Sequence, residues 1–165
     1  MEETTTATGL RMSVAPATTA DHGELRLEFG RIVDSGEGFP QEPPLTEEEF
    51  AKVWVEDKSA VIVARIDGEL VGAYYLKPNF PGRGAHIVNA GYFVVSEWRG
   101  KGIGEALVRH SFVQARHLGF DAMQYNLVFE DNPARALYER LGMQVAGRIP
   151  EAIDGRDAIV YWRKL

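Results

Sequence analysis

The sequence predicts a single α/β (α+β) domain in which helices cover both faces of a mixed, mostly antiparallel sheet. Three observations carry this prediction. Runs of β-branched residues alternate with amphipathic segments, a turn pair joins two of these runs into a hairpin, and a glycine-rich turn links a later strand to a helix. The 165 residues suit one compact domain, and 45% hydrophobic residues can fill its core.

The first part of the chain is expected to begin with a tail. Residues 1–10 are polar and rich in threonine without periodicity, so we expect a flexible tail before a domain over 11–165. A short strand is expected over 11–15. A helix begins near Asp21, because apolar residues follow at imperfect helical spacing: Leu25, Leu27, Phe29, Ile32 and Val33.

A second helix is expected after a loop rich in glycine and proline over 36–44. Thr46 and Glu49 have the spacing of a capping box, in which each side chain satisfies a free backbone N–H group of the other. Apolar residues then follow at helical spacing: Phe50, Val53 and Trp54.

The remainder is expected to alternate strands and helices. Two β-branched runs, 61–66 and 70–76, flank the turn pair Asp67-Gly68 and predict an antiparallel hairpin. The later elements are expected as a strand over 86–95, a helix over 102–117, a strand over 122–129, a helix over 133–141, and strands over 144–149 and 158–164.

Composition narrows the classes of function. A net charge of −6 does not suit a protein that binds nucleic acid through a basic face. The chain has no cysteine, which excludes disulfides, thiolate metal sites and a thiol nucleophile. It shows no signal peptide and no apolar run of about 18 residues, the length that a membrane span needs. We therefore expect a cytoplasmic protein with no nucleic-acid or membrane partner and, without metal-ligand spacing, no metal.

A glycine-rich turn over 99–104 is the strongest functional signal. It lies between a predicted strand and the start of an amphipathic helix, where free N–H groups and the helix dipole favour phosphate. Arg99 and Lys101 add positive charge. The sequence lacks the Gly-Lys-Ser/Thr of a P-loop and the last glycine of a dinucleotide fingerprint. The alternative is a purely structural one, in which the glycines form a tight turn and Arg99 and Lys101 are an ordinary solvated basic pair.

The Arg-Gly-Lys-Gly-Ile-Gly run over 99–104 resembles the R/Q-x-x-G-x-G/A pyrophosphate loop of the GCN5-related N-acetyltransferases (GNAT). Residues 132–143 resemble that family's N-x-x-A-x-x-L-Y-x-x-x-G-F/M segment at the expected distance. The resemblance implies acetyl-CoA as cofactor and a twisted sheet whose central strands splay apart. It also implies the cofactor-binding residues, which are Phe93, Val94, Val95, Arg99, Gly100, Lys101, Gly102, Ile103, Gly104, Asn132, Arg135 and Tyr138.

The resemblance also implies roles in the reaction. Tyr138 would protonate the departing thiolate, although aromatic residues at helical spacing otherwise belong to a core. A backbone N–H within 93–95, that of Val95 first, would bond the thioester oxygen. Asn132 is either an N-cap or a contact for the pantetheine arm, and the two roles are compatible.

The strand over 86–95 departs from the family pattern, because it lacks the glutamate that serves many members as base. His86 could titrate in the useful range, although a lone histidine at a strand start is more often structural. A water relayed from Asn89 or Tyr92 is an equal alternative. Asn89 is thus a candidate catalytic residue.

Two asparagines interrupt apolar strands and are candidate contacts for the acceptor substrate. Buried amides cost free energy unless they are bonded, so Asn89 and Asn126 indicate either a structural network or a ligand. Residues 77–94 with 126–129 are similar to fungal acetyltransferases that act on azetidine-2-carboxylate. This resemblance implies that Asn126 and the Leu127 backbone bind a substrate carboxylate. Phe39, on a loop over the pocket, and His86 complete the expected substrate site.

These inferences predict transfer of acetyl from acetyl-CoA to a small amine, a free amino or imino acid. The enzyme alternative acts on a protein or peptide amine. The alternative without catalysis is a CoA-binding sensor, since the carboxylate base is missing. Similar proteins are commonly homodimers.

Overall fold

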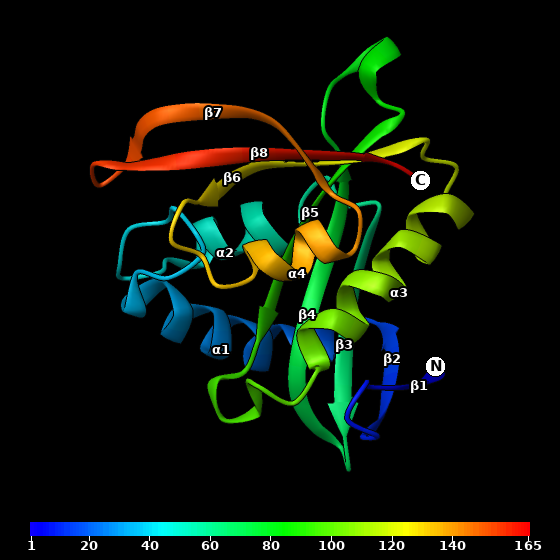
Figure 1. Ribbon diagram of the computed structural model, residues 1–165. Coiled ribbons are helices and arrows are strands. Elements are labelled where there is room, and N and C mark those ends of the chain that lie inside the picture. The colour runs from blue at the N-terminus through cyan, green and yellow to red at the C-terminus, as the bar shows by residue number, and fades with distance from the viewer.

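Eight strands form one open sheet in the order β1-β2-β3-β4-β5-β6-β8-β7 in a computed structural model that describes residues 1–165 (Figure 1). Every neighbouring pair is antiparallel except β5 and β6, which are parallel. The mixed, mostly antiparallel sheet is therefore as predicted. The strands are β1 Glu2–Thr5, β2 Arg11–Pro16, β3 Ala60–Ile66, β4 Glu69–Pro78, β5 Ile87–Val94, β6 Ala122–Phe129, β7 Gln144–Ile153 and β8 Arg156–Lys164.

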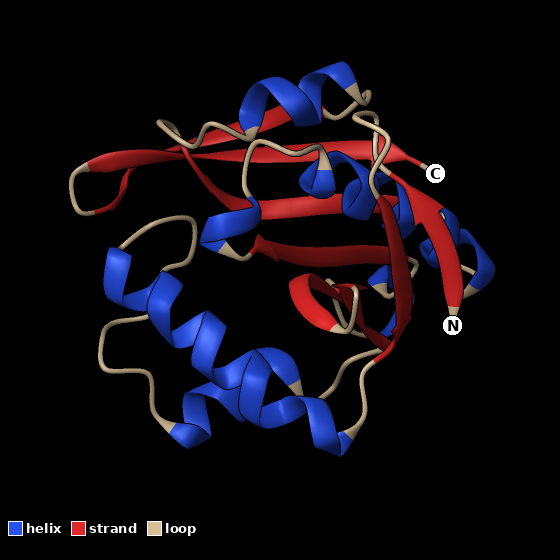
Figure 2. Ribbon diagram, turned by 90° about the horizontal axis from the view of Figure 1, so that it is seen from below, coloured by secondary structure: helices blue, strands red, loops and turns tan.

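Helices lie on both faces of the sheet, as Figure 2 shows from below. They are α1 His22–Ser35, α2 Glu47–Trp54, α3 Ile103–His117 and α4 Arg135–Arg140. The apolar faces of α1 and α2 form one buried cluster with side chains of β3, β4 and the end of β5. The faces of α3 and α4 join a larger cluster against the opposite face of the sheet. Burial on both faces is the main stabilisation of this arrangement.

The helical spacing that the sequence suggests for α1 is largely correct. Leu25, Phe29, Ile32 and Val33 are buried at the i, i+4, i+7 and i+8 positions of one face. Leu27 falls on the opposite face and is 56% exposed, which accounts for the imperfect period. The predicted capping box of α2 is present, with the Glu49 N–H donating to Thr46 Oγ1 at 3.1 Å.

The expected N-terminal tail is instead an ordered edge strand. Residues 2–5 form β1, which pairs antiparallel with β2. Thr6 follows and is 4% exposed, and Thr8 Oγ1 donates to the Lys101 carbonyl oxygen at 2.7 Å. The prediction fails because an edge strand held by backbone hydrogen bonds needs no alternating apolar side chains.

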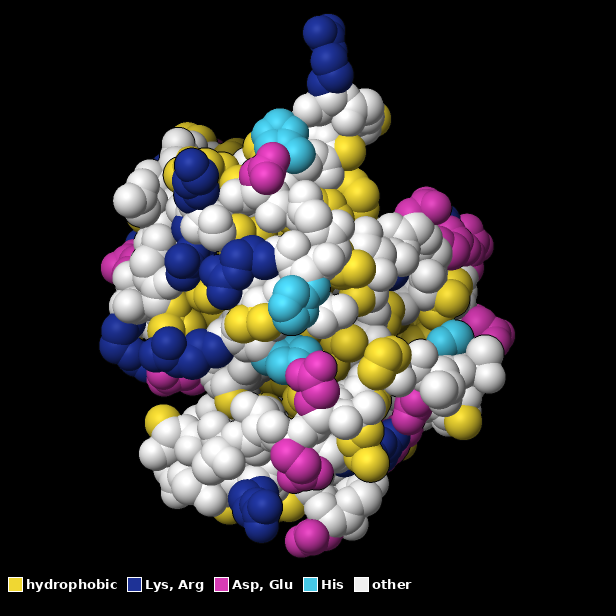
Figure 3. Space-filling model, turned by 90° about the vertical axis from the view of Figure 1, so that its right-hand side faces the viewer, with side chains coloured by type: hydrophobic (Ala, Val, Ile, Leu, Met, Phe, Trp, Pro, Cys, Tyr) yellow, Lys and Arg dark blue, Asp and Glu magenta, His cyan; other side chains and the backbone are white.

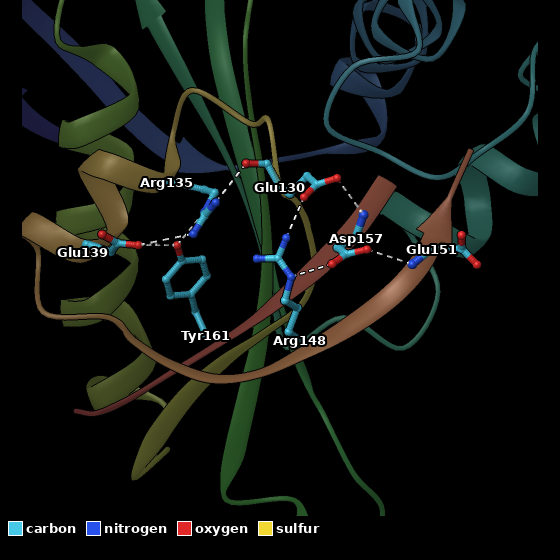
Figure 4. A network of polar contacts seen from close by, with 7 residues as sticks. All are labelled: Glu130, Arg135, Glu139, Arg148, Glu151, Asp157 and Tyr161. Carbon is cyan, nitrogen blue, oxygen red and sulfur yellow. Dashed lines mark hydrogen bonds and ion pairs between the residues drawn. The ribbon is translucent and has the colours of Figure 1, made fainter. Parts of the chain in front are cut away.

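The last hairpin is longer than predicted. Strand β7 extends to Ile153 and β8 begins at Arg156. Most side chains of β7 are exposed, so its outer half carries no apolar signal. Arg148 on β7 contacts Asp157 on β8 and Glu130 after β6, as Figure 4 shows. The Glu151 N–H donates to Asp157 Oδ1 at 2.9 Å and links the strands in the part of the hairpin that the hydrophobic pattern does not reveal.

Strands β5 and β6 separate in the middle of the sheet, and we call this opening the fork. Their ladder consists of three pairs and ends at Asn89 and Gln124. The Asn89 side chain donates from Nδ2 to the Gln124 carbonyl oxygen at 3.0 Å and so bridges the strands where they part. Beyond this point β5 pairs only with β4. The splayed central strands that the resemblance implies are present.

The face that carries α3 and the N-terminal hairpin has charges of both signs. Lys and Arg side chains gather on one half of this face, and many Asp and Glu side chains lie across the other half (Figure 3). Among the helices, none is both long and apolar enough to cross a membrane. No group of three or more His, Asp or Glu side chains is arranged to hold a metal ion.

Candidate active site

Two cavities meet at the fork. The larger has a volume of about 410 Å³ and the smaller about 200 Å³. They share five lining residues, which are Gly38, Phe39, Tyr92, Asn132 and Tyr138. These residues come from the loop after α1, from β5, and from α4 with the turn before it, so three separate segments form the common wall. A ligand in one cavity can therefore reach a ligand in the other through the fork.

The larger cavity includes the start of α3, where Gly104 lines it. The first N–H groups of this helix have no intrahelical acceptor, and the positive end of the helix dipole lies there. Arg99 also lines the cavity, and its Nη1 lies 2.8 Å from Glu37 Oε2. The Arg156 guanidinium stacks 4.6 Å from the centre of the Phe129 ring. The start of α3 with Arg99 makes one end of this cavity suitable for phosphate groups, while Arg156 is paired with Asp131 at 3.3 Å.

The backbone of β5 offers N–H groups to the fork, but Val95 is not among them. The Val95 N–H donates to the Val71 carbonyl oxygen of β4 at 2.9 Å, so the prediction of Val95 as donor is wrong. Hydrogen-bonding groups alternate in direction along an antiparallel ladder, and Val94 is the register partner of Gly72. The N–H groups of Tyr92 and Val94 consequently point away from β4, toward the fork. The sequence does not show which residues of β5 point their N–H groups toward β4, because that depends on the register of the two strands.

Tyr138 stands between the two cavities. It lies on α4, lines both cavities, and its hydroxyl makes no hydrogen bond to the protein. Its ring packs 4.8 Å from Tyr125 and 6.0 Å from Tyr161, measured between centroids. Burial raises the pKa of the Tyr138 phenol well above its ordinary value, because it penalises the phenolate. The hydroxyl is therefore a protonated donor with a free hydrogen.

The smaller cavity has an uncharged wall built from the fork and the loop after α1. Asn89 lines it and is 7% exposed. Asn126 also lines it and donates from Nδ2 to Asn79 Oδ1 at 2.6 Å. Asn126 and Leu127 lie on a bulge of β6, because the ladder with β8 passes from Tyr125 directly to Val128. The bulge removes Asn126 and Leu127 from the β8 ladder beside the cavity.

A sequence profile decides the family. The profile of the acetyltransferase (GNAT) family matches residues 26–143, which is more than half of the chain. The chain belongs to the GNAT family.

Individual relatives agree with this assignment. An 84-residue stretch is 44% identical to N-acetyltransferase aca1 of Schizosaccharomyces pombe and covers 50% of this chain and 40% of that protein. Another of 87 residues is 28% identical to the L-amino acid N-acetyltransferase AaaT of Escherichia coli, covering 52% and 54%. A GCN5-related N-acetyltransferase structure from Kribbella flavida has a TM-score of 0.86 and 33% identity, covering 93% and 98%. The matches span less than two thirds of the length of these curated relatives.

The glycine-rich segment of this GNAT protein contributes unequally to the cavity. Arg99 and Gly104 line it, whereas Ile103 is 1% exposed and belongs to the core. Gly100 and Gly102 have φ of 75° and 80°, the left-handed region that favours glycine, and they shape the turn. The Lys101 ammonium lies 4.4 Å from the centre of the Trp98 ring and does not line either cavity.

Two predicted residues of the second GNAT motif have different surroundings. Asn132 lines both cavities, and its Oδ1 accepts the Ala134 N–H at 2.9 Å, so a cap-like bond coexists with exposure to the site. Arg135 turns away from the cavities. It donates to the Tyr161 hydroxyl and the Glu130 carbonyl oxygen, both at 2.9 Å (Figure 4). The structure therefore places Arg135 in a structural network and outside the cavity wall.

Of the two remaining predicted substrate residues, one lines the cavities and the other does not. Phe39 lines both cavities and packs edge-on against Phe29, with 4.9 Å between ring centroids. His86 is exposed before β5, bonds the Arg83 carbonyl oxygen and lines neither cavity, which contradicts its expected place in the substrate site. Further lining residues escaped the motif search. Glu37, Gln41 and Asp131 lie on loops, Arg156 begins β8, and Tyr75 lies within β4.

Proposed function

We propose that this GNAT chain transfers the acetyl group of acetyl-CoA directly to the amine of a free amino or imino acid. One observation carries the proposal: a free Tyr138 hydroxyl and outward N–H groups of β5 meet at the fork between two cavities. One cavity has the start of a helix and arginines, and the other is uncharged. This arrangement suits a transfer between two bound molecules.

The larger cavity fits the cofactor. Its glycines allow close approach to the start of α3, and a Cβ placed at Gly104 would meet only Val94 Cγ2 at 3.7 Å. The Gly104 and Arg99 end would hold the pyrophosphate. The Tyr92 and Val94 N–H groups would bond the pantetheine arm and the thioester oxygen. When bound, acetyl-CoA supplies an activated acyl group whose carbon–sulfur bond breaks as the carbon–nitrogen bond forms.

Tyr138 would protonate the sulfur that leaves. The role requires a hydroxyl that is protonated at neutral pH, close to the fork and not committed to another bond. Burial supplies the first condition by raising the phenol pKa, and the position of Tyr138 in both cavity walls supplies the second. The unbonded hydroxyl supplies the third. The chain has no cysteine that could form an acyl-enzyme intermediate, which agrees with direct attack by the amine.

The amine must be neutral when it attacks. The smaller cavity has no charged side chain, and removal from water into such a site favours the neutral form of an amine. This effect reduces the need for the glutamate base that β5 lacks. His86 is too exposed and remote from the cavity wall to replace it, whereas Asn89 lines the cavity and can orient a water that carries the proton away.

The acceptor would carry a carboxylate. Asn126 lies on the β6 bulge and retains one N–H beyond the bond to Asn79, and the neighbouring Leu127 backbone also lies beside the cavity. These groups would bind the carboxylate. The relation to AaaT, an L-amino acid N-acetyltransferase, supports this class of acceptor.

Thiol release from acetyl-CoA tests the proposal. The protein would be assayed with a thiol-reactive dye against cyclic imino acids, primary amino acids, polyamines and a basic peptide. The chain has no cysteine, so the dye reports only free CoA. Release with amino or imino acids is expected. Release with the peptide alone would indicate a peptide acetyltransferase, and binding of acetyl-CoA without release would indicate a sensor.

A further inference from the structure

We infer that Tyr75 selects the acceptor, because its hydroxyl donates a hydrogen bond to the carboxylate of the amino or imino acid in the smaller cavity. The inference rests on the proposed acetyltransferase function and deepens it. It adds a second neutral donor, from β4, to the Asn126 amide on β6. Under this inference, an amine that carries a carboxylate is acetylated more efficiently than the same amine without one.

The Tyr75 hydroxyl is free to bind a ligand. Tyr75 lines the smaller cavity, and its hydroxyl makes no hydrogen bond to the protein. Three unpaired side-chain atoms are fully buried, in Gln41, Trp54 and Asn79, whereas the Tyr75 hydroxyl is accessible. Burial of the ring raises the pKa of the Tyr75 phenol to about 12. The hydroxyl therefore stays protonated at neutral pH and offers its hydrogen to the cavity.

A glycine determines where this hydroxyl lies. Tyr75 on β4 and Gly91 on β5 are register partners, so they lie on the same face of the sheet. A Cβ at Gly91 would be 2.5 Å from Tyr75 Cε1 and 2.6 Å from its hydroxyl oxygen, closer than real Cβ atoms approach. Gly91 also lines the smaller cavity. The missing side chain therefore lets the Tyr75 ring lie across β5, with its hydroxyl against the backbone of that strand.

The Tyr75 ring is held in place before a ligand arrives. The Trp54 ring of α2 packs edge-on against it, with 5.3 Å between centroids. The Lys58 ammonium lies 5.4 Å from the centre of the Tyr75 ring and donates to the carbonyl oxygens of Lys52 and Glu56. A side chain fixed in this way loses little conformational entropy when it binds a ligand.

Asn126 reaches the same face of the sheet as Tyr75. Asn89 lies two residues before Gly91 and is the register partner of Gln124, so these side chains share that face. Gln124 Nε2 donates to Asn126 Oδ1 at 3.1 Å, which places the Asn126 amide there as well. Tyr75 and Asn126 both line a cavity of about 200 Å³. One small carboxylate can therefore contact both donors.

The wall of the smaller cavity leaves carboxylate recognition to neutral donors, because all 15 lining residues are uncharged. Among the lining hydroxyls, those of Tyr92 and Tyr125 bond each other at 2.9 Å. The Tyr138 hydroxyl is assigned to the leaving sulfur, so that of Tyr75 is left for the acceptor. A hydrogen bond to an ionised group is roughly twice as strong as one between neutral groups. The Tyr75 hydroxyl thus favours a carboxylate over a neutral substituent.

Two substitutions test the inference, each assayed with a cyclic imino acid and with the same cyclic amine lacking the carboxylate. Tyr75→Phe keeps the ring and removes the hydroxyl, so kcat/KM for the imino acid should fall at least about tenfold. The kcat/KM for the plain amine and the Kd for acetyl-CoA should stay within about twofold of the wild type. Gly91→Ala keeps the hydroxyl but displaces it, and should lower the ratio of the two kcat/KM values in the same direction.

Tyr74→Phe is the matched control, because Tyr74 precedes Tyr75 on β4, packs on the opposite face and lines neither cavity. It should leave the ratio as in the wild type. An unchanged ratio in Tyr75→Phe, or an equal fall with both acceptors, would overturn the inference. So would a wild type that acetylates the plain amine as efficiently as the imino acid, although acetyl transfer to an amine would then stand. Acetyl-CoA binding without thiol release on any amine would overturn both proposals.

Discussion

The two cavities at the fork differ in charge and in how the chain builds them. The larger has four charged side chains in its wall, Glu37, Arg99, Asp131 and Arg156, whereas the smaller has none. The larger one also includes a strand, a glycine-rich turn and a helix that are contiguous in sequence. The smaller one collects side chains from β4, β5, β6, α4 and a loop. A helix start with Arg99 near it suits the phosphates of the cofactor, and a neutral wall of dispersed residues suits one acceptor class.

Removing the Tyr138 hydroxyl should have the largest effect, because both cavities share it. For Tyr138→Phe we expect kcat to fall about 100-fold, the usual contribution of a general acid. The Kd for acetyl-CoA, measured by calorimetry, should remain unchanged. Tyr74→Phe is the control, since the Tyr74 hydroxyl bonds His110 Nδ1 at 2.7 Å and lines neither cavity. Equal kcat values for both variants would remove Tyr138 from the reaction.

The pH dependence of kcat in the wild type is a second test of Tyr138 as the general acid. Because burial raises the folded-state pKa of Tyr138, the phenol stays protonated above pH ~10, the ordinary tyrosine value. The kcat should therefore show no alkaline decrease below that pH. A decrease that disappears in Tyr138→Phe would show that the phenol ionises earlier than its burial implies.

Filling the larger cavity should affect only the cofactor. Gly104→Val adds a side chain at the second position of α3, where the nearest heavy atom is Val94 Cγ2 at 3.7 Å, so the fold should tolerate it. The Kd for acetyl-CoA should rise roughly 30-fold, in line with about 2 kcal/mol of steric cost. Gly23→Val is the matched control, because Gly23 is the second residue of α1 and faces open space. If both variants bind acetyl-CoA like the wild type, the cofactor does not occupy this cavity.

Changing the smaller cavity should affect only the acceptor. Asn126→Ala should raise KM for an amino or imino acid about tenfold through the loss of a hydrogen bond to its carboxylate. Cofactor affinity should not change. Gln124→Ala removes the 3.1 Å bond to Asn126 Oδ1 without altering the lining, and its effect on KM should be smaller. An unchanged KM in Asn126→Ala would refute the carboxylate assignment.

The smallest effect is expected at the N-terminal hairpin. Thr8→Val removes the hydroxyl that donates to the Lys101 carbonyl oxygen and so loosens the turn before α3. The Kd for acetyl-CoA should rise about threefold, the equivalent of a net hydrogen bond of modest strength. Thr5→Val is the control in the same hairpin, because the exposed Thr5 side chain makes no hydrogen bond. Equal Kd values for the two variants would show that the hairpin does not support the cofactor site.

The sequence locates both cavities but does not identify every residue of their walls, for physical reasons. Glycines with positive φ, at Gly100 and Gly102, can be recognised in a sequence because few other residues adopt that backbone. The direction of the Val95 N–H depends on the register of β5 against β4, which lies outside the local pattern. The turn of Arg135 toward Tyr161 likewise depends on packing between distant segments.

The difference between local signals and contacts of distant segments also explains which parts of the fold the sequence predicts. The helices and the β3–β4 hairpin follow from hydrophobic period and turn residues, which act locally. Strand β1 escapes because backbone pairing alone holds it, and its side chains are mostly exposed.

The most direct test is a crystal structure with CoA and the N-acetylated imino acid bound together. We expect the pyrophosphate at the start of α3, the sulfur beside Tyr138, and the carboxylate of the product in the smaller cavity beside Asn126. Such a result would confirm that the charged and uncharged cavities divide cofactor from acceptor. A product that occupies the larger cavity, or CoA bound away from the fork, would contradict this division.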